Sequence, residues 1–216
     1  MSDIENLKVH YPSEGSFTQP APRSLGNPGS LGLFSFASTT FMLSLFNVSA
    51  RNIHTPNVVV GMACFTGGLA QLLAGMWEFP NGNTFGATAF TSYGAFWLSY
   101  ASILLPNTGI IAAYTDPEEL ASALGIFLFA WFIVTVMFLI ASLRKSVAFI
   151  VLFGFLAITF GFLGAGEFSG NPNITKIGGG CGLFTAAVAY YIGLSDLLAA
   201  ERAAVVSLPT GAFKHY

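Results

Sequence analysis

Six long apolar segments constrain the fold of this 216-residue chain more than any other feature. They run over residues 31–48, 58–77, 85–105, 120–143, 147–166 and 177–200. Each is close to the roughly 20 residues that an α-helix needs to cross the hydrocarbon core of a bilayer. Only 8% of the residues are charged, against about 25% in an average soluble domain. We therefore predict an all-α integral membrane protein with six transmembrane helices.

Short links separate the six segments, so neighbouring helices should run antiparallel. The predicted organisation is a polar, disordered tail over residues 1–26, a transmembrane domain over 27–201 and a short second tail over 202–216. The tails and the even-numbered links hold most of the basic residues, and the odd-numbered links hold only Arg51 and Lys176. Because positive residues stay on the cytoplasmic side, both tails are expected to be cytoplasmic.

Charge and motif content exclude several classes of function. The net charge is -2, so the chain offers no basic surface for nucleic acid. No metalloprotease-type motif occurs, and the three histidines, His10, His54 and His215, lie in a link or in the tails. Cys64 and Cys181 lie within apolar segments, where they are expected to pack as small side chains. We predict a protein that is not an enzyme and that needs no metal or cofactor.

Three apolar segments carry a polar face at helical spacing. Such faces would be costly against lipid, so they are expected to turn toward one another or toward water. Hydrogen bonding between the helices alone would also account for many of them. The faces are Phe36, Thr40, Ser44 and Asn47; Gly67, Gln71, Ala74 and Glu78; and Thr88, Ser92, Ser99 and Ser102.

The junction over residues 78–97 holds more polar and small residues than a link between two membrane helices requires. Glu78 opens it and shares a face with Gln71. This carboxyl could bind a proton, or it could fix the turn by accepting hydrogen bonds from the backbone amides of Asn83 or Thr84. Near the first segment, Asn27 or Ser30 could cap the helix start, whose positive end would also attract a small anion.

Two motifs resemble those of a known family. The stretch NPGSLGL at residues 27–33 resembles the NPxPLGL signature of the acetate uptake transporter family, which includes fungal acetate permeases and bacterial succinate-acetate permeases. The stretch GGLAQ at 67–71, followed by GNTFGATAFTSYGAFW at 82–97, is similar to that family's longest signature. The resemblance covers residues 27–200 and is closer to the fungal branch. Residues 79–81 depart from it, because many relatives carry basic residues there.

The resemblance implies one pathway per subunit, within six helices, and assembly of the subunits as a homo-hexamer. In the family, a Phe of the first helix, a Tyr of the third and a Leu of the fifth form an apolar constriction. By position these are similar to Phe36, Tyr93 and Leu156. A multi-pass protein of the plasma membrane is the expectation that follows.

The function expected from these features is membrane transport of acetate and other small mono- or dicarboxylates, either proton-coupled or channel-like. Weak polar contacts suit conduction better than one strong ion pair. Glu78 is the candidate proton carrier, unless its role is structural. Alternatives are a non-transporting sensor or scaffold that responds to acetate, and an ammonium transporter. The candidate substrate-binding residues are Asn27, Thr39, Thr40, Asn47, Gln71, Thr88 and Ser92.

Overall fold

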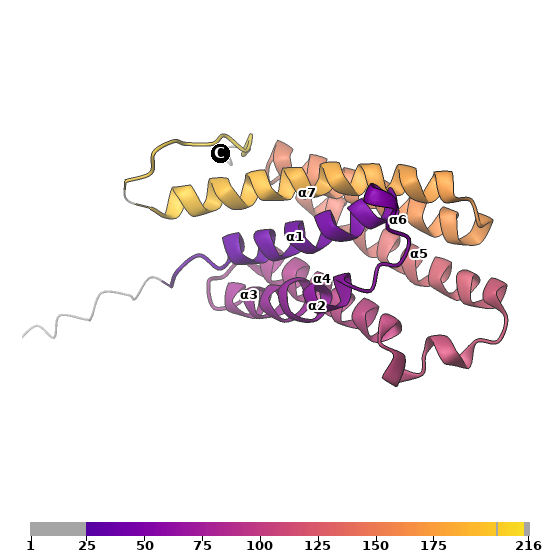
Figure 1. Cartoon of the computed structure of the whole chain (residues 1–216). Helices are drawn as coiled ribbons and strands as arrows, with labels where there is room; N and C mark the ends of the chain where they lie inside the picture. Colours follow the sequence, from indigo (N-terminus) through magenta and orange to yellow (C-terminus); the bar gives the residue numbers. More distant parts are fainter. Residues whose placement is uncertain (1–24, 202, 214–216) are drawn as a thin grey trace, which may run out of the picture.

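The computed structural model describes residues 25–201 and 203–213, and in this part the chain is helical apart from its links and one isolated antiparallel bridge. The predicted tail over residues 1–26 lies almost entirely outside the described residues. Figure 1 shows long helices lying side by side, with the beginning of α1 and the end of α7 at the same end of the molecule. The helices are α1 (Gly29–Asn47), α2 (Val59–Cys64), α3 (Gln71–Glu78), α4 (Thr84–Leu104), α5 (Pro117–Ser142), α6 (Val147–Ser169) and α7 (Pro172–Ala200).

All six predicted segments are helical, and their ends differ from the predicted ends by a few residues. Within the described residues, five helical spans are long and apolar enough to cross a membrane, namely 29–47, 59–78, 117–142, 147–169 and 172–200. Helix α4 has a similar length, 21 residues, but its hydroxyl and glycine residues lower its hydropathy. It tolerates them because much of it is enclosed by the other helices.

The second span is a helix with an internal irregularity. A π-helical turn, Phe65–Ala70, joins α2 to α3 and contains the Gly67-Gly68 pair. Such turns are rare and occur often at functional sites. A Cβ on Gly67 would lie 2.8 Å from the Trp97 ring of α4, so only glycine allows this approach. Gln71 follows the π-helical turn directly.

Side chains in the links fix where several helices begin. Asn83, Asp116, Ser146 and Asn171 each accept a hydrogen bond from a backbone amide in the first turn of α4, α5, α6 and α7, respectively. These contacts satisfy amides that have no partner inside the helix. At the start of α1, the Asn27 side chain accepts from the Gly29 amide at 2.9 Å. Asn27, and not Ser30, therefore caps that helix.

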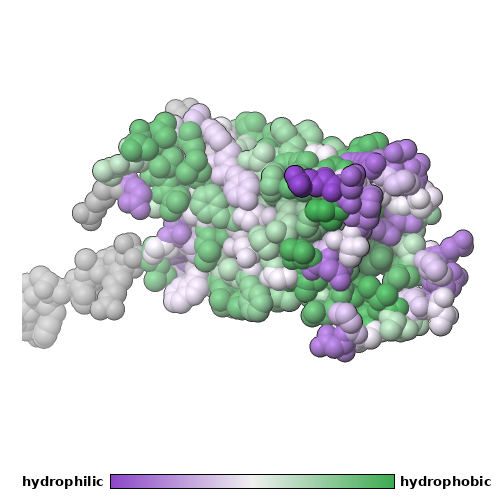
Figure 2. Space-filling model, in the orientation of Figure 1, coloured by the Kyte–Doolittle hydropathy of each residue, from purple (hydrophilic) through white to green (hydrophobic). Residues whose placement is uncertain are grey.

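Helices α1 and α4 lie toward the inside, while α5 is the least enclosed of the five candidate membrane spans. Helix α1 packs mainly on α7, and α6 lies between α5 and α7. The surface in Figure 2 is largely hydrophobic along the helices, with hydrophilic residues gathered toward the two ends. This distribution agrees with a multi-pass membrane protein.

The predicted tail over residues 202–216 is not separate from the helices along its whole length. Residues 208–213 run back along α7 and pack across the start of α6. We call this segment the C-terminal strap. Gly211 lies within it with a φ of 66°, a left-handed conformation that favours glycine.

Candidate transport pathway

Two cavities lie end to end inside the helices and share part of their walls. The first, of about 160 Å³, contains Glu78 in its wall, and the second, of about 120 Å³, contains Glu167. We call them the Glu78 cavity and the Glu167 cavity. Phe36 and Tyr93 line both. The two side chains therefore form the partition between the cavities.

The partition is aromatic and tightly enclosed. The ring centroids of Phe36 of α1 and Tyr93 of α4 lie 5.6 Å apart, and the two side chains are 5% and 3% exposed. Leu156 of α6 is equally buried and lines the Glu167 cavity together with them. The three residues assigned to a constriction from the family resemblance thus come together from three different helices.

The hydroxyl of Tyr93 is held by α5. It lies 2.9 Å from the Thr135 hydroxyl, and Thr135 donates its own proton to the Trp131 carbonyl at 2.7 Å. Since Thr135 has one proton to donate, Tyr93 must be the donor to Thr135. The phenolic proton is therefore not available to a solute in this arrangement, and Tyr93 contributes its ring to the partition.

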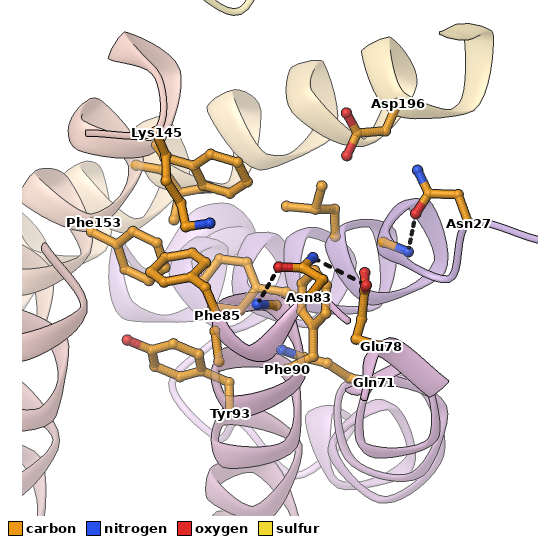
Figure 3. A pocket seen from close by; sticks show the side chains of 17 residues that line it. Asn27, Gln71, Glu78, Asn83, Phe85, Phe90, Tyr93, Lys145, Phe153 and Asp196 are labelled. Carbon is orange, nitrogen blue, oxygen red and sulfur yellow. Dashed lines mark hydrogen bonds between the residues drawn. The ribbon is translucent and has the colours of Figure 1, made fainter. Parts of the chain in front are cut away.

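Gln71 is the most unusual polar residue of the Glu78 cavity (Figure 3). Its side chain is 0% exposed, yet neither its Nε2 nor its Oε1 has a hydrogen-bond partner among the described residues. Nearly all buried polar groups in proteins are paired, and an unpaired one costs free energy. An amide left unpaired in a cavity wall is suited to a polar solute or to water inside the cavity.

Glu78 and Asn83 together hold the bend between α3 and α4. The Asn83 Nδ2 donates to the Glu78 Oε2 at 3.0 Å, and the Asn83 Oδ1 accepts from the Gly86 amide at 3.1 Å (Figure 3). The Asn83 backbone amide bonds to the Glu78 carbonyl at 3.1 Å. The expected bond from a backbone amide to the Glu78 carboxyl is thus replaced by one from the Asn83 side chain, and the second carboxyl oxygen takes no part in the bend.

That second oxygen shares its surroundings with another acid. A Cβ on Gly29 would lie 3.1 Å from the Glu78 Oε1 and 3.6 Å from the Asp196 Oδ2. Asp196 of α7 lines the same cavity, as do Asn27 and Lys145. Lys145 comes from the link between α5 and α6 and lies over the Phe85 ring, with its nitrogen 4.5 Å from the ring centroid. This end of the pathway therefore combines two carboxyl groups with one ammonium group.

The Glu167 cavity is more apolar, with a row of polar side chains along one wall. Phe36, Thr40, Ser44 and Asn47 all line it, which confirms that this face of α1 turns inward. The Thr40 hydroxyl and the Trp97 Nε1 are buried without hydrogen-bond partners among the described residues. Both could bind a polar solute on this side of the partition.

Three candidate substrate-binding residues do not line either cavity. Thr39 is buried, but its hydroxyl donates to the Ser35 carbonyl at 3.0 Å. Thr88 is exposed and donates to the Thr84 carbonyl at 2.8 Å, and Ser92 is half-buried outside the cavities. Thr88 and Ser92 of α4 therefore lie on a face of that helix that does not line the cavities. The α4 residues that line the two cavities are instead apolar or aromatic: Phe85, Gly86, Ala89, Phe90, Tyr93, Phe96, Trp97, Tyr100, Ile103 and Leu104.

Lys145, Thr135 and the side chain of Asn83 belong to this region but were not among the predicted site residues. Lys145 is one of the basic residues of the even-numbered links that predict the membrane orientation, and Thr135 is one hydroxyl within an apolar helix. The adjacent Arg144-Lys145 pair was a usable signal, because it falls on the same predicted side of the membrane as Glu78. In the described residues, no group of three His, Cys, Asp or Glu side chains could hold a metal ion.

Comparisons with a family model and with individual proteins point to the same family. The model of the GPR1/FUN34/yaaH family matches residues 11–214. Acetate permease A of Emericella nidulans is 44% identical over 91% of this chain and 72% of its own length. The succinate-acetate/proton symporter SatP of Escherichia coli is 37% identical over 87% of this chain and 96% of its own. Ammonia transport outward protein 2 of Saccharomyces cerevisiae is 42% identical over 88% of this chain and 68% of its own.

A solved structure has the same fold. The structure of the bacterial acetate channel SatP aligns with a TM-score of 0.77 and 35% identity, over 86% of this chain and the whole of that chain. Fungal relatives at 42 to 45% identity are longer, and this chain spans 60 to 72% of their lengths.

Proposed function

Because this chain belongs to the GPR1/FUN34/yaaH family, we propose that it transports acetate and other small carboxylates across a membrane. The observation that carries the proposal is that two cavities meet at one aromatic partition, formed by Phe36 and Tyr93. A solute that passed this partition would move from one end of the helices toward the other. The relatives that are a permease, a symporter and a channel support a transporter and not an enzyme.

The cavities offer weak polar contacts on both sides of the partition. Gln71 would receive the carboxylate in the Glu78 cavity, with Asn27 near the mouth, and Thr40 and Asn47 would receive it in the Glu167 cavity. Single amide and hydroxyl contacts hold an anion loosely enough for it to leave again. Phe36, Tyr93 and Leu156 would act as the gate, because a narrow apolar passage opposes free movement of a hydrated anion.

We also propose that Glu78 couples transport to protons. Its Oε2 holds the bend through Asn83, while its Oε1 lies toward Gly29 and the Asp196 carboxyl. A carboxyl with one free oxygen at a cavity wall can exchange a proton without opening the bend. The name of the bacterial symporter supports coupling, and that of the bacterial channel supports passive flow. We propose the coupled form for this chain, with Glu78 as the carrier.

The orientation of the protein, the membrane that holds it and its oligomeric state are also proposals. Both ends of the chain would face the cytoplasm, so the Glu78 cavity, which lies at the end of the molecule where α7 finishes, would open to the cytoplasm. The protein would lie in the plasma membrane as a homo-hexamer, as the family resemblance implies. Exposed apolar side chains on the helices, such as Leu73, Ile133 and Met137, would contact lipid or neighbouring subunits.

A second candidate is ammonium transport, which the name of the yeast relative favours. The carboxyl groups of Glu78, Asp196 and Glu167 in the cavity walls would suit a small cation. Purified protein in liposomes separates the two candidates: labelled acetate should enter, and unlabelled succinate or lactate should compete with it more strongly than ammonium does. Competition by ammonium alone, or acetate binding without flux, would contradict carboxylate transport; the second result would instead indicate a sensor.

A further inference from the structure

The C-terminal strap is tied to the helices by an unbroken row of carbonyl groups. Four consecutive backbone carbonyls each accept a hydrogen bond, two from side chains of α7 and two from the first amides of α6. The donors are Ser195 Oγ to Leu208 at 2.7 Å, Tyr191 OH to Pro209 at 2.8 Å, Ala148 N to Thr210 at 3.1 Å and Val147 N to Gly211 at 3.0 Å.

The strap also holds the link that carries Lys145. The Phe213 amide donates to the Lys145 carbonyl at 3.1 Å, and Ala212 pairs with Ser146 in an antiparallel bridge. The Ser146 hydroxyl accepts from the Phe149 amide at 3.2 Å. The first amides of α6, which have no partner inside the helix, are therefore all hydrogen-bonded to the strap or to Ser146. A solute anion cannot bind there, and the positive charge available at this place is the Lys145 ammonium group.

Lys145 is the only Lys or Arg that lines either cavity in the part of the chain that the structure describes. Its neighbour Arg144 is exposed and lines neither. The same mouth carries the carboxyl groups of Glu78 and Asp196, which would repel an incoming carboxylate when ionised. The Lys145 ammonium group lines the same cavity and lowers that repulsion, provided that it stays in place.

We propose that the C-terminal strap positions Lys145 so that its ammonium group collects carboxylate anions at the mouth of the Glu78 cavity. The inference rests on the proposed function and adds a recognition residue and the segment that orients it. A lysine side chain is long and flexible, so its reach depends on where its backbone is held. The strap holds the Lys145 backbone directly, through the bond from the Phe213 amide to the Lys145 carbonyl. It also holds the residues that follow Lys145, through the bonds from the first amides of α6 to the strap carbonyls.

The test measures acetate flux in proteoliposomes as a function of acetate concentration on the Glu78-cavity side. Lys145→Gln should raise the half-saturating concentration about fivefold at low salt, with a maximal rate close to the native one. Lys145→Arg should keep the native value, and Arg144→Gln is the matched control for loss of a charge outside the cavity. The difference between native protein and Lys145→Gln should shrink in high salt, because salt screens an exposed charge.

The strap is loosened by Tyr191→Phe together with Ser195→Ala, which remove two of its hydrogen bonds and leave the strap sequence intact. This variant should raise the half-saturating concentration in the native background and add nothing in the Lys145→Gln background. If the pair reduces folding, as a thermal melt would show, Ser195→Ala alone replaces it. The inference would be overturned if the strap variant and Lys145→Gln raised the half-saturating concentration independently, so that their effects added. It would also be overturned if either change left the half-saturating concentration at the native value. Absence of flux in the native protein would instead contradict the proposed function.

Discussion

The phenolic oxygen of Tyr93 lies 2.9 Å from the Thr135 hydroxyl of α5, and this pair anchors the partition between the two cavities. Thr135 is fully buried and donates its own proton to the Trp131 carbonyl. Tyr93 also packs against the rings of Phe36 and Phe138, whose centroids are each 5.6 Å from its own. Helix α5 thus holds Tyr93 at its hydroxyl through Thr135 and at its ring through Phe138, and α1 packs against the ring through Phe36.

Thr135→Val should loosen the partition and destabilise the protein. The change keeps the shape of the side chain but leaves the Tyr93 hydroxyl buried without an acceptor, which costs about 1–3 kcal/mol. We expect a lower melting temperature in detergent and a less selective acetate flux. Thr88→Val is the matched control, since its hydroxyl is exposed and bonds within its own helix. An unchanged melting temperature in Thr135→Val would show that the pair does not contribute to stability.

Gln71→Leu should stabilise the fold and reduce transport. The unpaired amide of Gln71 costs free energy in the folded protein, so an apolar side chain of similar size should gain about 1–2 kcal/mol. The same change removes the polar contact for a carboxylate, and acetate flux should fall at least several-fold. Opposite changes in melting temperature and flux are the signature of a binding residue.

The control for Gln71 is Thr91→Val. The Thr91 hydroxyl is buried without a hydrogen-bond partner among the described residues, but Thr91 lines neither cavity. This variant should be as stable as the native protein or more stable, with native flux. If Gln71→Leu also keeps native flux, Gln71 does not contact the solute.

The sequence predicted the helices well because hydrophobic length is a strong and local signal. It also predicted that Phe36, Thr40, Ser44 and Asn47 share an inward face, since α1 is regular from end to end. The face over Thr88 and Ser92 was assigned to the pathway for the same reason, and the structure places it elsewhere. Hydroxyl groups that bond to their own helix can face outward, and helical spacing does not reveal this.

The positions of Lys145 and of the C-terminal strap depend on contacts between distant parts of the chain. The strap reaches α6 across more than 60 residues of sequence, and no local pattern records that pairing. Asn83 could be expected to cap α4, but its second bond, to the Glu78 carboxyl, depends on the turn at Gly82. A local pattern thus predicts one role for a residue such as Asn83, and the folded structure shows the second role, which depends on a contact outside that pattern.

Asn83→Ala should destabilise the bend between α3 and α4. It removes the cap of α4 and the side-chain donor to Glu78, and loss of such a cap costs about 1–2 kcal/mol. A melting curve compared with that of Asn81→Ala checks this, because Asn81 is exposed and, in the part of the chain that the structure describes, its side chain bonds only to the Gly26 carbonyl. Equal melting temperatures for the two variants would contradict the role of Asn83.

Glu78→Gln separates the structural role of Glu78 in the bend from its proposed role as a proton carrier. The glutamine oxygen can still accept from Asn83, so the melting temperature and downhill acetate flux should stay near the native values. The side chain no longer binds a proton in the relevant range, so accumulation of acetate driven by a pH gradient should be lost. The measurement is uptake with the gradient imposed and then collapsed. Native accumulation in Glu78→Gln would leave this residue with a structural role only.

The most direct test of the pathway is the ratio of acetate flux to flux of a larger carboxylate, such as succinate, in native protein and in Phe36→Ala. Phe36 lines both cavities, so truncating its ring should widen the partition. We expect flux of the larger acid to rise more than flux of acetate, in a preparation whose folding is verified by its melting curve. An unchanged ratio, with both fluxes at native levels, would mean that solutes do not pass between Phe36 and Tyr93.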